Sequence, residues 1–296
     1  MITKPKTEYI KNPIFISYTS LSDFLKCPRS YYLKNVYKNK RPLMEGEEPH
    51  EPFKIQIASP YLSLGSTVHD AIKWYIEMER QATYEQLEAK FRNFWLKYRG
   101  KKGGFASREQ EGDFGKRGLT MLENFFKNAK TLEDEHHTIE FPKYPLLDNV
   151  ILMGNFDFIG EKADETLHVV DFKTGVTDEK DPIQLYIYAI LAEVNLEKPV
   201  TSASFWYLDR DDKPREIVLD PLEPKLEWLK EKAKEIKQAL EKGEWVCSPR
   251  SRFGEAGIKG EELCRDCQGY QAIVDGKGEF QFSDYRYKKD IYYLPK

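Results

Sequence analysis

The stretch Gly154–Gly175, GNFDFIGEKADETLHVVDFKTG, decides the fold of this chain. Two runs rich in apolar and β-branched residues, 149–160 and 167–173, stand on either side of the turn-like segment EKADET. Strand-forming runs separated by turn residues are typical of a β-hairpin. The sequence therefore predicts two adjacent strands here, and the rest of the chain can be placed around them.

One face of this hairpin gathers charged groups. Because residues two apart on a strand share a face, Asp171 and Lys173 should project together into a cleft while Phe172 points into the core. Asp157 should lie on the neighbouring strand. Carboxylates and a lysine are costly to bury unpaired. Either Lys173 forms a salt bridge with an aspartate on a solvated face, or the aspartates bind Mg²⁺ or Mn²⁺, since hard divalent cations prefer carboxylate oxygens.

Other polar residues stand near the hairpin in the sequence. Gln184 and Tyr188 are four apart on a predicted helix and so share a face, where they could hydrogen-bond phosphates or bases. The alternative is a core tyrosine beside an incidental glutamine. His69 follows GSTV at a predicted helix start. It is either a structural hydrogen-bonding residue or an imidazole ligand of the same metal.

The pattern of apolar residues around the hairpin indicates an α/β protein. It predicts helices over 66–79, 84–98, 116–130, 182–194 and 223–242, strands over 203–209 and 216–220, and loops over 41–60 and 99–113. The order of these segments favours an α/β core with a helical insertion.

Composition excludes several classes of protein. Of the 296 residues, 40% are hydrophobic and 14% aromatic, which is too much core-forming material for a disordered chain. A net charge of −3 excludes a uniformly basic protein, so any nucleic-acid site must be a local patch such as the basic, aromatic residues 1–40. No apolar run approaches the ~18 residues of a membrane span, and no apolar signal segment is present. We expect a soluble cytoplasmic protein without a membrane partner.

The four cysteines are Cys27, Cys247, Cys264 and Cys267. A reducing compartment disfavours structural disulfides, so clustered cysteines indicate metal ligands or buried apolar residues.

Taken in order, six segments resemble the RecB/AddB-like nuclease domain of the PD-(D/E)xK superfamily, which includes CRISPR-associated RecB-like exonucleases. They are SYTSLSDFLKCPRSYYLKNVY (17–37), GSTVHDAI (65–72), GNFDFI (154–159), VVDFKTG (169–175), QLYIYA (184–189) and CRDC (264–267). The resemblance implies a restriction-endonuclease-like core, a mixed central β-sheet flanked by helices. It also implies one nuclease domain over 1–275, with a helical insertion at about 71–137 and a cysteine segment at 243–270. An aromatic-basic tail, 276–296, follows.

The resemblance also implies roles for the site residues. The metal ligands would be His69, Asp157, Asp171 and the backbone carbonyl of Phe172. Lys173 is similar to the catalytic lysine of the family, which positions or activates the attacking water. Gln184 and Tyr188 match the QxxxY motif of the helix beside the site.

The resemblance extends to iron–sulfur members of the family, in which one early cysteine joins three late ones around a [4Fe–4S] cluster. Cys27 lies in the matching Cys-Pro-Arg context, and Cys264 and Cys267 form a CxxC pair. The chain departs from the pattern because the cysteine usual after this pair is missing, so that Cys247 is the substitute. Zinc, or no metal at all, is the alternative.

These implications lead to one expected function and two alternatives. We expect an Mg²⁺- or Mn²⁺-dependent deoxyribonuclease, an exonuclease on single-stranded DNA or DNA ends in repair, recombination or CRISPR-type processing. Helicases or CRISPR adaptation proteins are the candidate partners. The alternatives are a non-catalytic DNA-binding subunit of a larger repair complex and a nuclease for RNA. The joint presence of Asp157, Asp171 and Lys173 argues against a mere scaffold.

Overall fold

The computed structural model describes residues 2, 12–133, 135–247 and 263–295. The chain divides into two compact units, each built from three separate segments. Unit 1 comprises Met1–Tyr18, Leu64–Trp95 and Asp113–Glu241, and unit 2 comprises Thr19–Ser63, Leu96–Gly112 and Lys242–Lys296. The expected boundary at residue 275 falls inside unit 2, and the single domain over 1–275 stays a prediction.

Unit 1 holds all or most of the following elements: β1 (Ile14–Ile16), α3 (Pro60–Glu77), α4 (Tyr84–Trp95), α5 (Arg108–Asn128), the 3₁₀ helix η4 (Ala129–Thr131), β3 (Glu135–His136), β4 (Lys143–Leu147), β5 (Val150–Met153), β6 (Phe158–Glu161), β7 (Leu167–Lys173), α6 (Ile183–Leu196), β8 (Val200–Tyr207), β9 (Arg215–Ile217) and α7 (Leu222–Lys242). These bounds confirm the predicted helices to within a few residues, except that α3 and α5 begin earlier. The predicted loops 41–60 and 99–113 are therefore wrong in part.

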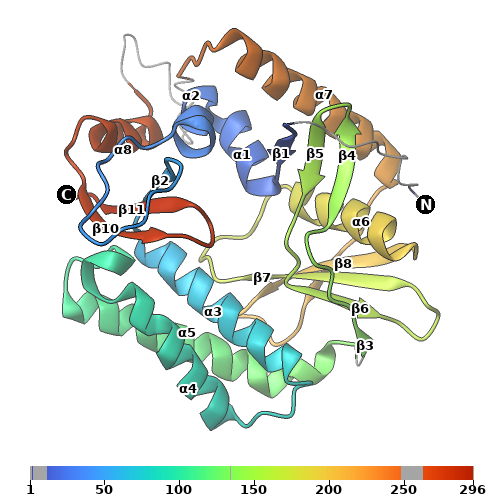
Figure 1. The fold of residues 1–296 in the computed structure, drawn as a ribbon. Helices are drawn as coiled ribbons and strands as arrows, with labels where there is room; N and C mark the ends of the chain where they lie inside the picture. The colour runs from blue at the N-terminus through green and yellow to red at the C-terminus, as the bar shows by residue number, and fades with distance from the viewer. Residues whose placement is uncertain (1, 3–11, 134, 248–262, 296) are drawn as a thin grey trace. The chain divides into compact units, whose positions relative to one another are not determined.

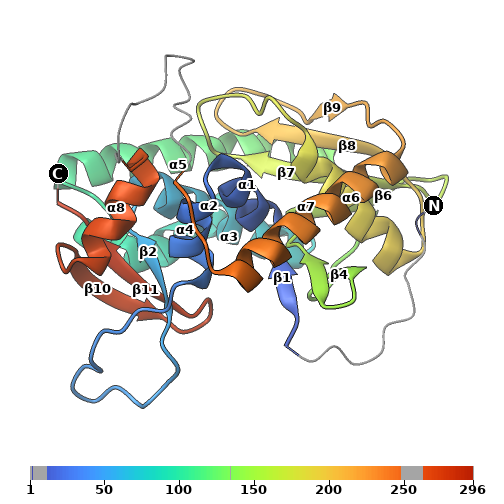
Figure 2. The same cartoon turned by 90° about the horizontal axis from the view of Figure 1, so that it is seen from above.

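The central sheet of unit 1 has the strand order β3-β6-β7-β8-β9. The antiparallel pair β6–β7 is the predicted hairpin, and β7 pairs with β8 in parallel, as Figure 2 shows. The run 149–160 is not one strand as predicted, because β5 belongs to a second sheet, β1-β5-β4. Between β5 and β6 the chain passes close to α6 at Gly154, where a Cβ atom would lie 2.8 Å from Leu191 Cδ1.

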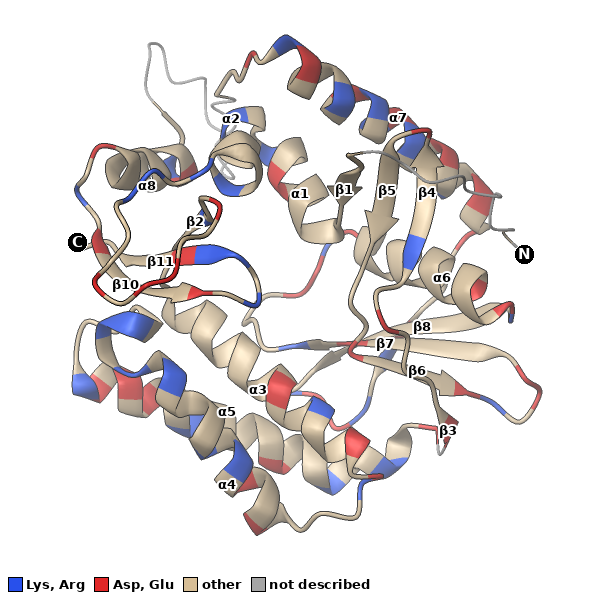
Figure 3. Ribbon diagram, viewed as in Figure 1, with Lys and Arg blue, Asp and Glu red and all other residues tan. Residues whose placement is uncertain are grey.

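Helices cover both faces of the central sheet (Figure 1). Helices α3, α4 and α5 pack on one face, against an apolar cluster that includes Phe158, Phe172 and Trp206. Helix α6 packs on the other face through Leu185, beside Phe205. It is apolar nearly all round and buried, as expected of a helix enclosed on every side. In Figure 3 acidic and basic residues alternate along α5 and α7, whereas β8 carries none.

Unit 2 contains α1 (Tyr18–Lys26), α2 (Pro28–Tyr31), the π-helix η1 (Tyr32–Val36), β2 (Lys54–Ile57), the 3₁₀ helices η2 (Leu96–Tyr98) and η3 (Gly100–Gly103), α8 (Arg265–Val274), β10 (Glu279–Asp284) and β11 (Lys289–Tyr293). Its sheet has the order β10-β11-β2, so the aromatic-basic tail forms a β-hairpin. Strand β2 was missed because its alternation is short: Phe53 and Ile55 are buried on either side of the half-buried Lys54.

No helix within the described part of the chain combines the length and the apolar character that crossing a bilayer requires.

Candidate active site

Strand β7 sends alternate side chains to the two faces of the central sheet. Asp171 lies opposite Phe205, on the face covered by α6, and Lys173 follows two residues later on the same face. Phe172 points the other way into the apolar cluster, 2% exposed, with its ring centroid 5.5 Å from that of Phe125. The predicted alternation is therefore confirmed.

The polar residues of α6 meet the charged residues of β7. Lys173 Nζ lies 2.9 Å from Asp171 Oδ2 and donates a hydrogen bond of 2.7 Å to Gln184 Oε1. Gln184 Nε2 in turn donates to Asp171 Oδ1 at 2.6 Å and to the hydroxyl of Tyr188 at 3.0 Å. The two α6 residues are one turn apart and so present both side chains to the strand. Glu179 adds a carboxylate oxygen 3.7 Å from Lys173 Nζ.

Asp157 joins this cluster to α3. It lies directly before β6, and its Oδ2 accepts a 2.9 Å hydrogen bond from the backbone N–H of Phe172. Its other oxygen, Oδ1, is 2.7 Å from His69 Nδ1. His69 lies well inside α3, which begins at Pro60, rather than at a helix start as the sequence pattern predicted. All the predicted site residues of unit 1 are thus brought into one connected group.

Burial governs the electrostatics of this group. Asp171 is only 3% exposed, so the expectation that it faces an open cleft is wrong. Burial and then the negative charge of Asp157 raise the pKa of Asp171. Burial alone would lower the pKa of Lys173, but the charge of Asp171 raises it overall. Burial likewise opposes protonation of His69, yet the charge and hydrogen bond of Asp157 raise the pKa of that histidine to about 9.

The donor set suits a hard divalent ion, although its atoms are not arranged around one point. Asp171 Oδ2 is buried and accepts no hydrogen bond of normal geometry. Two carboxylates, an imidazole and a backbone carbonyl are ligands that Mg²⁺ and Mn²⁺ accept. His69 and Asp157 are hydrogen-bonded to each other. Among the described residues, neither belongs to a group of three or more potential ligand atoms that all lie within 4.8 Å of one another.

Comparison with known proteins identifies the family. The sequence profile of the PD-(D/E)XK nuclease superfamily matches residues 16–272. The chain belongs to the PD-(D/E)XK nuclease superfamily. A search of curated proteins gives no match. The predicted superfamily and the predicted restriction-endonuclease-like core are confirmed, and membership implies a nuclease, a hydrolase of phosphodiester bonds. The RecB-like subtype stays a prediction.

Two residues beside this cluster were not singled out from the sequence. Burial, followed by the negative charge of Glu179, raises the pKa of Tyr18, which also interacts electrostatically with Lys173. Tyr18 was visible only as one aromatic residue in the segment SYTSL, and Glu179 as one acid in the segment TDEKD. Only the folded chain brings both to Lys173.

The four cysteines also come together, within unit 2. Cys27 Sγ lies 3.8 Å from Cys247 Sγ and 3.6 Å from Cys267 Sγ, and the last two sulfurs are 3.7 Å apart. All four sulfurs, including that of Cys264, lie within 4.8 Å of one another. Burial raises the pKa of Cys264 and of Cys267. Thiols gathered so closely in an apolar environment are a fitting set of metal ligands.

Proposed function

We propose that this member of the PD-(D/E)XK superfamily is an Mg²⁺- or Mn²⁺-dependent deoxyribonuclease that acts on single strands or ends of DNA. The observation that supports the proposal is the connected cluster of Asp157, Asp171, Lys173 and Gln184, which come from the start of β6, from β7 and from α6 of unit 1. A purely structural cluster has little reason to hold two carboxylates whose repulsion raises the pKa of the buried one.

The residues present would divide the work as follows. Asp157, Asp171, His69 and the carbonyl of Phe172 would hold the divalent ion. When bound, such an ion stabilises negative charge at phosphorus and makes a coordinated water nucleophilic near neutral pH. Lys173 would orient the attacking water and place its ammonium beside the phosphoryl oxygens.

Gln184 and Tyr188 act as positioning residues in this proposal. The amide of Gln184 accepts a hydrogen bond from Lys173 with its oxygen and donates one to Asp171 with its nitrogen, which fixes the ammonium and the carboxylate relative to each other. Tyr188 accepts the second hydrogen of the same amide nitrogen and so fixes its orientation.

A cleavage assay tests the proposal. Purified protein is incubated with labelled single-stranded or duplex DNA and Mn²⁺ or Mg²⁺, with EDTA as the metal-free control. We expect metal-dependent cleavage that falls at least about a hundredfold in Lys173→Met and in Asp171→Asn. Lys162→Met, in the turn of the same hairpin, is the matched control and should keep full activity. Equal rates in Lys173→Met and in the wild type would contradict the site. DNA binding without cleavage under any metal would favour the non-catalytic subunit.

We infer that the cysteine cluster binds a single zinc ion rather than a [4Fe–4S] cluster. Ligands at about 2.3 Å in a tetrahedron lie about 3.8 Å apart, which agrees with the separations of 3.6–3.8 Å among the sulfurs of Cys27, Cys247 and Cys267. The sulfur of Cys264 lies within 4.8 Å of these three. In a [4Fe–4S] cluster each thiolate binds a different iron, and this holds the sulfurs much farther apart. Elemental analysis of anaerobically purified protein should find one zinc per chain and no visible absorption band. Stoichiometric iron and sulfide would overturn this inference.

A further inference from the structure

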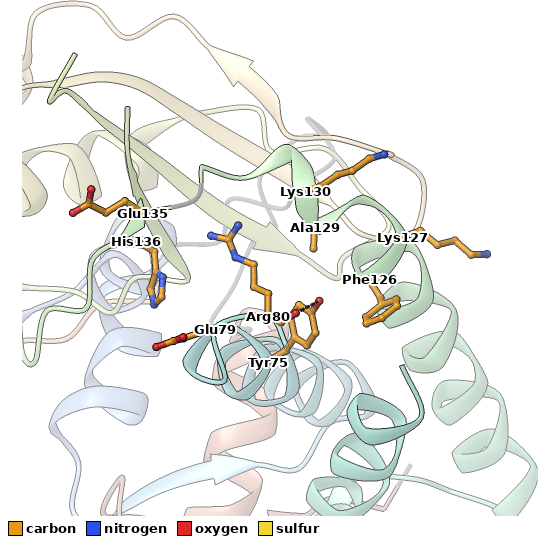
Figure 4. A pocket seen from close by; sticks show the side chains of 9 residues that line it. All are labelled: Tyr75, Glu79, Arg80, Phe126, Lys127, Ala129, Lys130, Glu135 and His136. Atoms are coloured by element: carbon orange, nitrogen blue, oxygen red, sulfur yellow. Dashed lines mark hydrogen bonds between the residues drawn. The ribbon is translucent and has the colours of Figure 1, made fainter. Parts of the chain in front are cut away.

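An open pocket of about 670 Å³ lies in unit 1, where the end of α3 meets the end of α5 and strand β3 (Figure 4). It is lined by Tyr75, Glu79, Arg80, Phe126, Lys127, Ala129, Lys130, Glu135 and His136. None of these residues belongs to the proposed catalytic cluster.

Aromatic rings form one wall of this pocket. The ring centroids of Tyr75 and Phe126 are 5.5 Å apart, and Phe126 also packs 5.6 Å from Tyr84. Tyr75 is buried, whereas Phe126 is half-buried and presents part of its ring to the cavity. An aromatic ring held in this way can stack on a nucleobase of any sequence.

Basic side chains stand at the rim. Lys127 and Lys130 are exposed and extend outward from the end of α5 and from η4 (Figure 4). Among the described residues, the ion-pair partner of Lys127 is Glu123, one turn earlier on the same helix, at 2.6 Å. An exposed pair of this kind contributes little stability and is readily exchanged for a phosphate. Arg80 donates hydrogen bonds to the backbone carbonyls of Leu132 and Glu133, so it lines the pocket as a fixed positive charge.

A second, smaller hollow lies beside Asp157 of the catalytic cluster. It has a volume of about 50 Å³, includes Asp157 in its lining, and shares His136 with the larger pocket. Strand β3 pairs His136 with Gly160, three residues beyond Asp157 on the neighbouring chain segment. At about 3.3 Å per residue, the backbone opposite His136 lies about 10 Å along the chain from that of Asp157.

Helix α3 follows the same path. His69, Lys73 and Glu77 recur at intervals of four residues, which sets them on one face of the helix, and Arg80 follows three residues after its last residue. From His69 to Glu77 this face covers about 12 Å. Lys73 and Glu77 line the smaller hollow, and Arg80 lines the larger pocket. Two independent elements therefore lead from the catalytic cluster to the pocket.

We propose that this pocket binds nucleotides of the substrate DNA strand that flank the scissile phosphate. The proposal rests on the proposed nuclease function and adds a path for the strand. Bases would stack on Phe126, and Lys127 and Lys130 would contact backbone phosphates. Such contacts do not depend on sequence, because they use the faces of the bases and the charge of the backbone.

Binding without cleavage tests the pocket alone. The double variant Lys127→Glu/Lys130→Glu is compared with Lys234→Glu/Lys237→Glu, a pair with the same spacing and charge change on α7 (Figure 3). Fluorescence anisotropy with oligothymidylate in EDTA gives the affinity at several salt concentrations. We expect the first variant to bind about tenfold more weakly at low salt, with a salt slope lower by about two. The control should bind like the wild type. Equal losses in both variants, or none in the first, would overturn the proposal.

Cleavage provides the second readout. Bis(p-nitrophenyl) phosphate is too small to reach the pocket, so Lys127→Glu/Lys130→Glu should hydrolyse it at the wild-type rate while cleaving an oligonucleotide more slowly. Equal losses on both substrates would show a damaged fold and overturn the assignment. If the wild type cleaves neither substrate, the proposed function fails. The anisotropy comparison still decides the pocket, because it needs no catalysis.

Discussion

Gln184 contacts both charged residues of β7, although it carries no charge itself. Its amide accepts from Lys173 and donates to Asp171 and Tyr188. Replacing it with leucine would keep the volume but release both charged groups. We expect Gln184→Leu to lower kcat about 10- to 100-fold with little change in KM, the size of effect found when a positioning partner is removed. Tyr188→Phe removes one hydrogen bond of the amide and leaves those to Lys173 and Asp171, so it should lose much less. Steady-state kinetics on an oligonucleotide measures kcat and KM for both variants, and a change in KM alone would contradict the positioning role.

A line of three hydrogen-bonded side chains in unit 1, Ser204–His168–Glu133, resembles the catalytic triad of a hydrolase but cannot act as one. Ser204 Oγ lies 2.7 Å from His168 Nε2, and His168 Nδ1 lies 2.7 Å from Glu133 Oε1. Ser204 is 1% exposed on the central sheet, so no substrate reaches it. The line therefore satisfies buried polar atoms, and we expect Ser204→Ala to lose about 1 kcal/mol of stability without loss of cleavage.

The pH dependence of stability tests the same line. Burial alone would raise the pKa of Glu133, but the hydrogen bond with His168 lowers it overall. A carboxyl whose pKa is lower in the folded state stabilises the fold above its unfolded pKa, and the contribution disappears as the pH falls through the folded pKa. The difference in unfolding free energy between the wild type and Glu133→Gln should therefore shrink as the pH falls below about 4. Urea unfolding at several pH values measures it, and a pH-independent difference would contradict this account.

At the scale of elements, the sequence predicts what depends on local periodicity. The alternation around Asp171 and the one-turn spacing of Gln184 and Tyr188 both follow from chain geometry and are found in the fold. The separation of β5 from β6 could not be predicted, since it depends on pairing with β1, which lies far away in the sequence. The approach of Glu179 to Lys173 depends on a loop and left no periodic signal.

Helix α5 offers a matched pair of glycines that differ only in their surroundings. A Cβ atom at Gly118 would lie 2.5 Å from Phe91 Cζ on α4, whereas one at Gly115 would meet nothing within 4 Å. Gly118→Ala should therefore destabilise unit 1 by about 1–3 kcal/mol through overpacking. Gly115→Ala should stabilise it by about 0.4–1 kcal/mol, because alanine loses less backbone entropy in a helix. Chemical denaturation compares the two, and equal effects would show that the α4–α5 contact does not govern this helix.

At the scale of the whole molecule, the cysteine cluster joins distant parts of the chain. Cys27 and Cys247 are 220 residues apart in the sequence, yet both belong to unit 2. Closing so long a loop with a shared ion restricts the unfolded chain and ties unit 2 together. If the cysteines were only buried apolar residues, each would contribute separately.

Because ligands of one ion act together, the decreases in Tm caused by removing two of them should not add. We expect Cys27→Ser and Cys264→Ser each to lower Tm by at least about 5 °C. The double variant should melt no lower than the less stable single variant, since losing one ligand already releases the ion. Wild-type protein from which a chelator has removed the metal should have the same Tm as the single variants. Calorimetry of the four samples decides the matter. Losses that add in the double variant would mean that the sulfurs stabilise unit 2 by packing, without a shared ion.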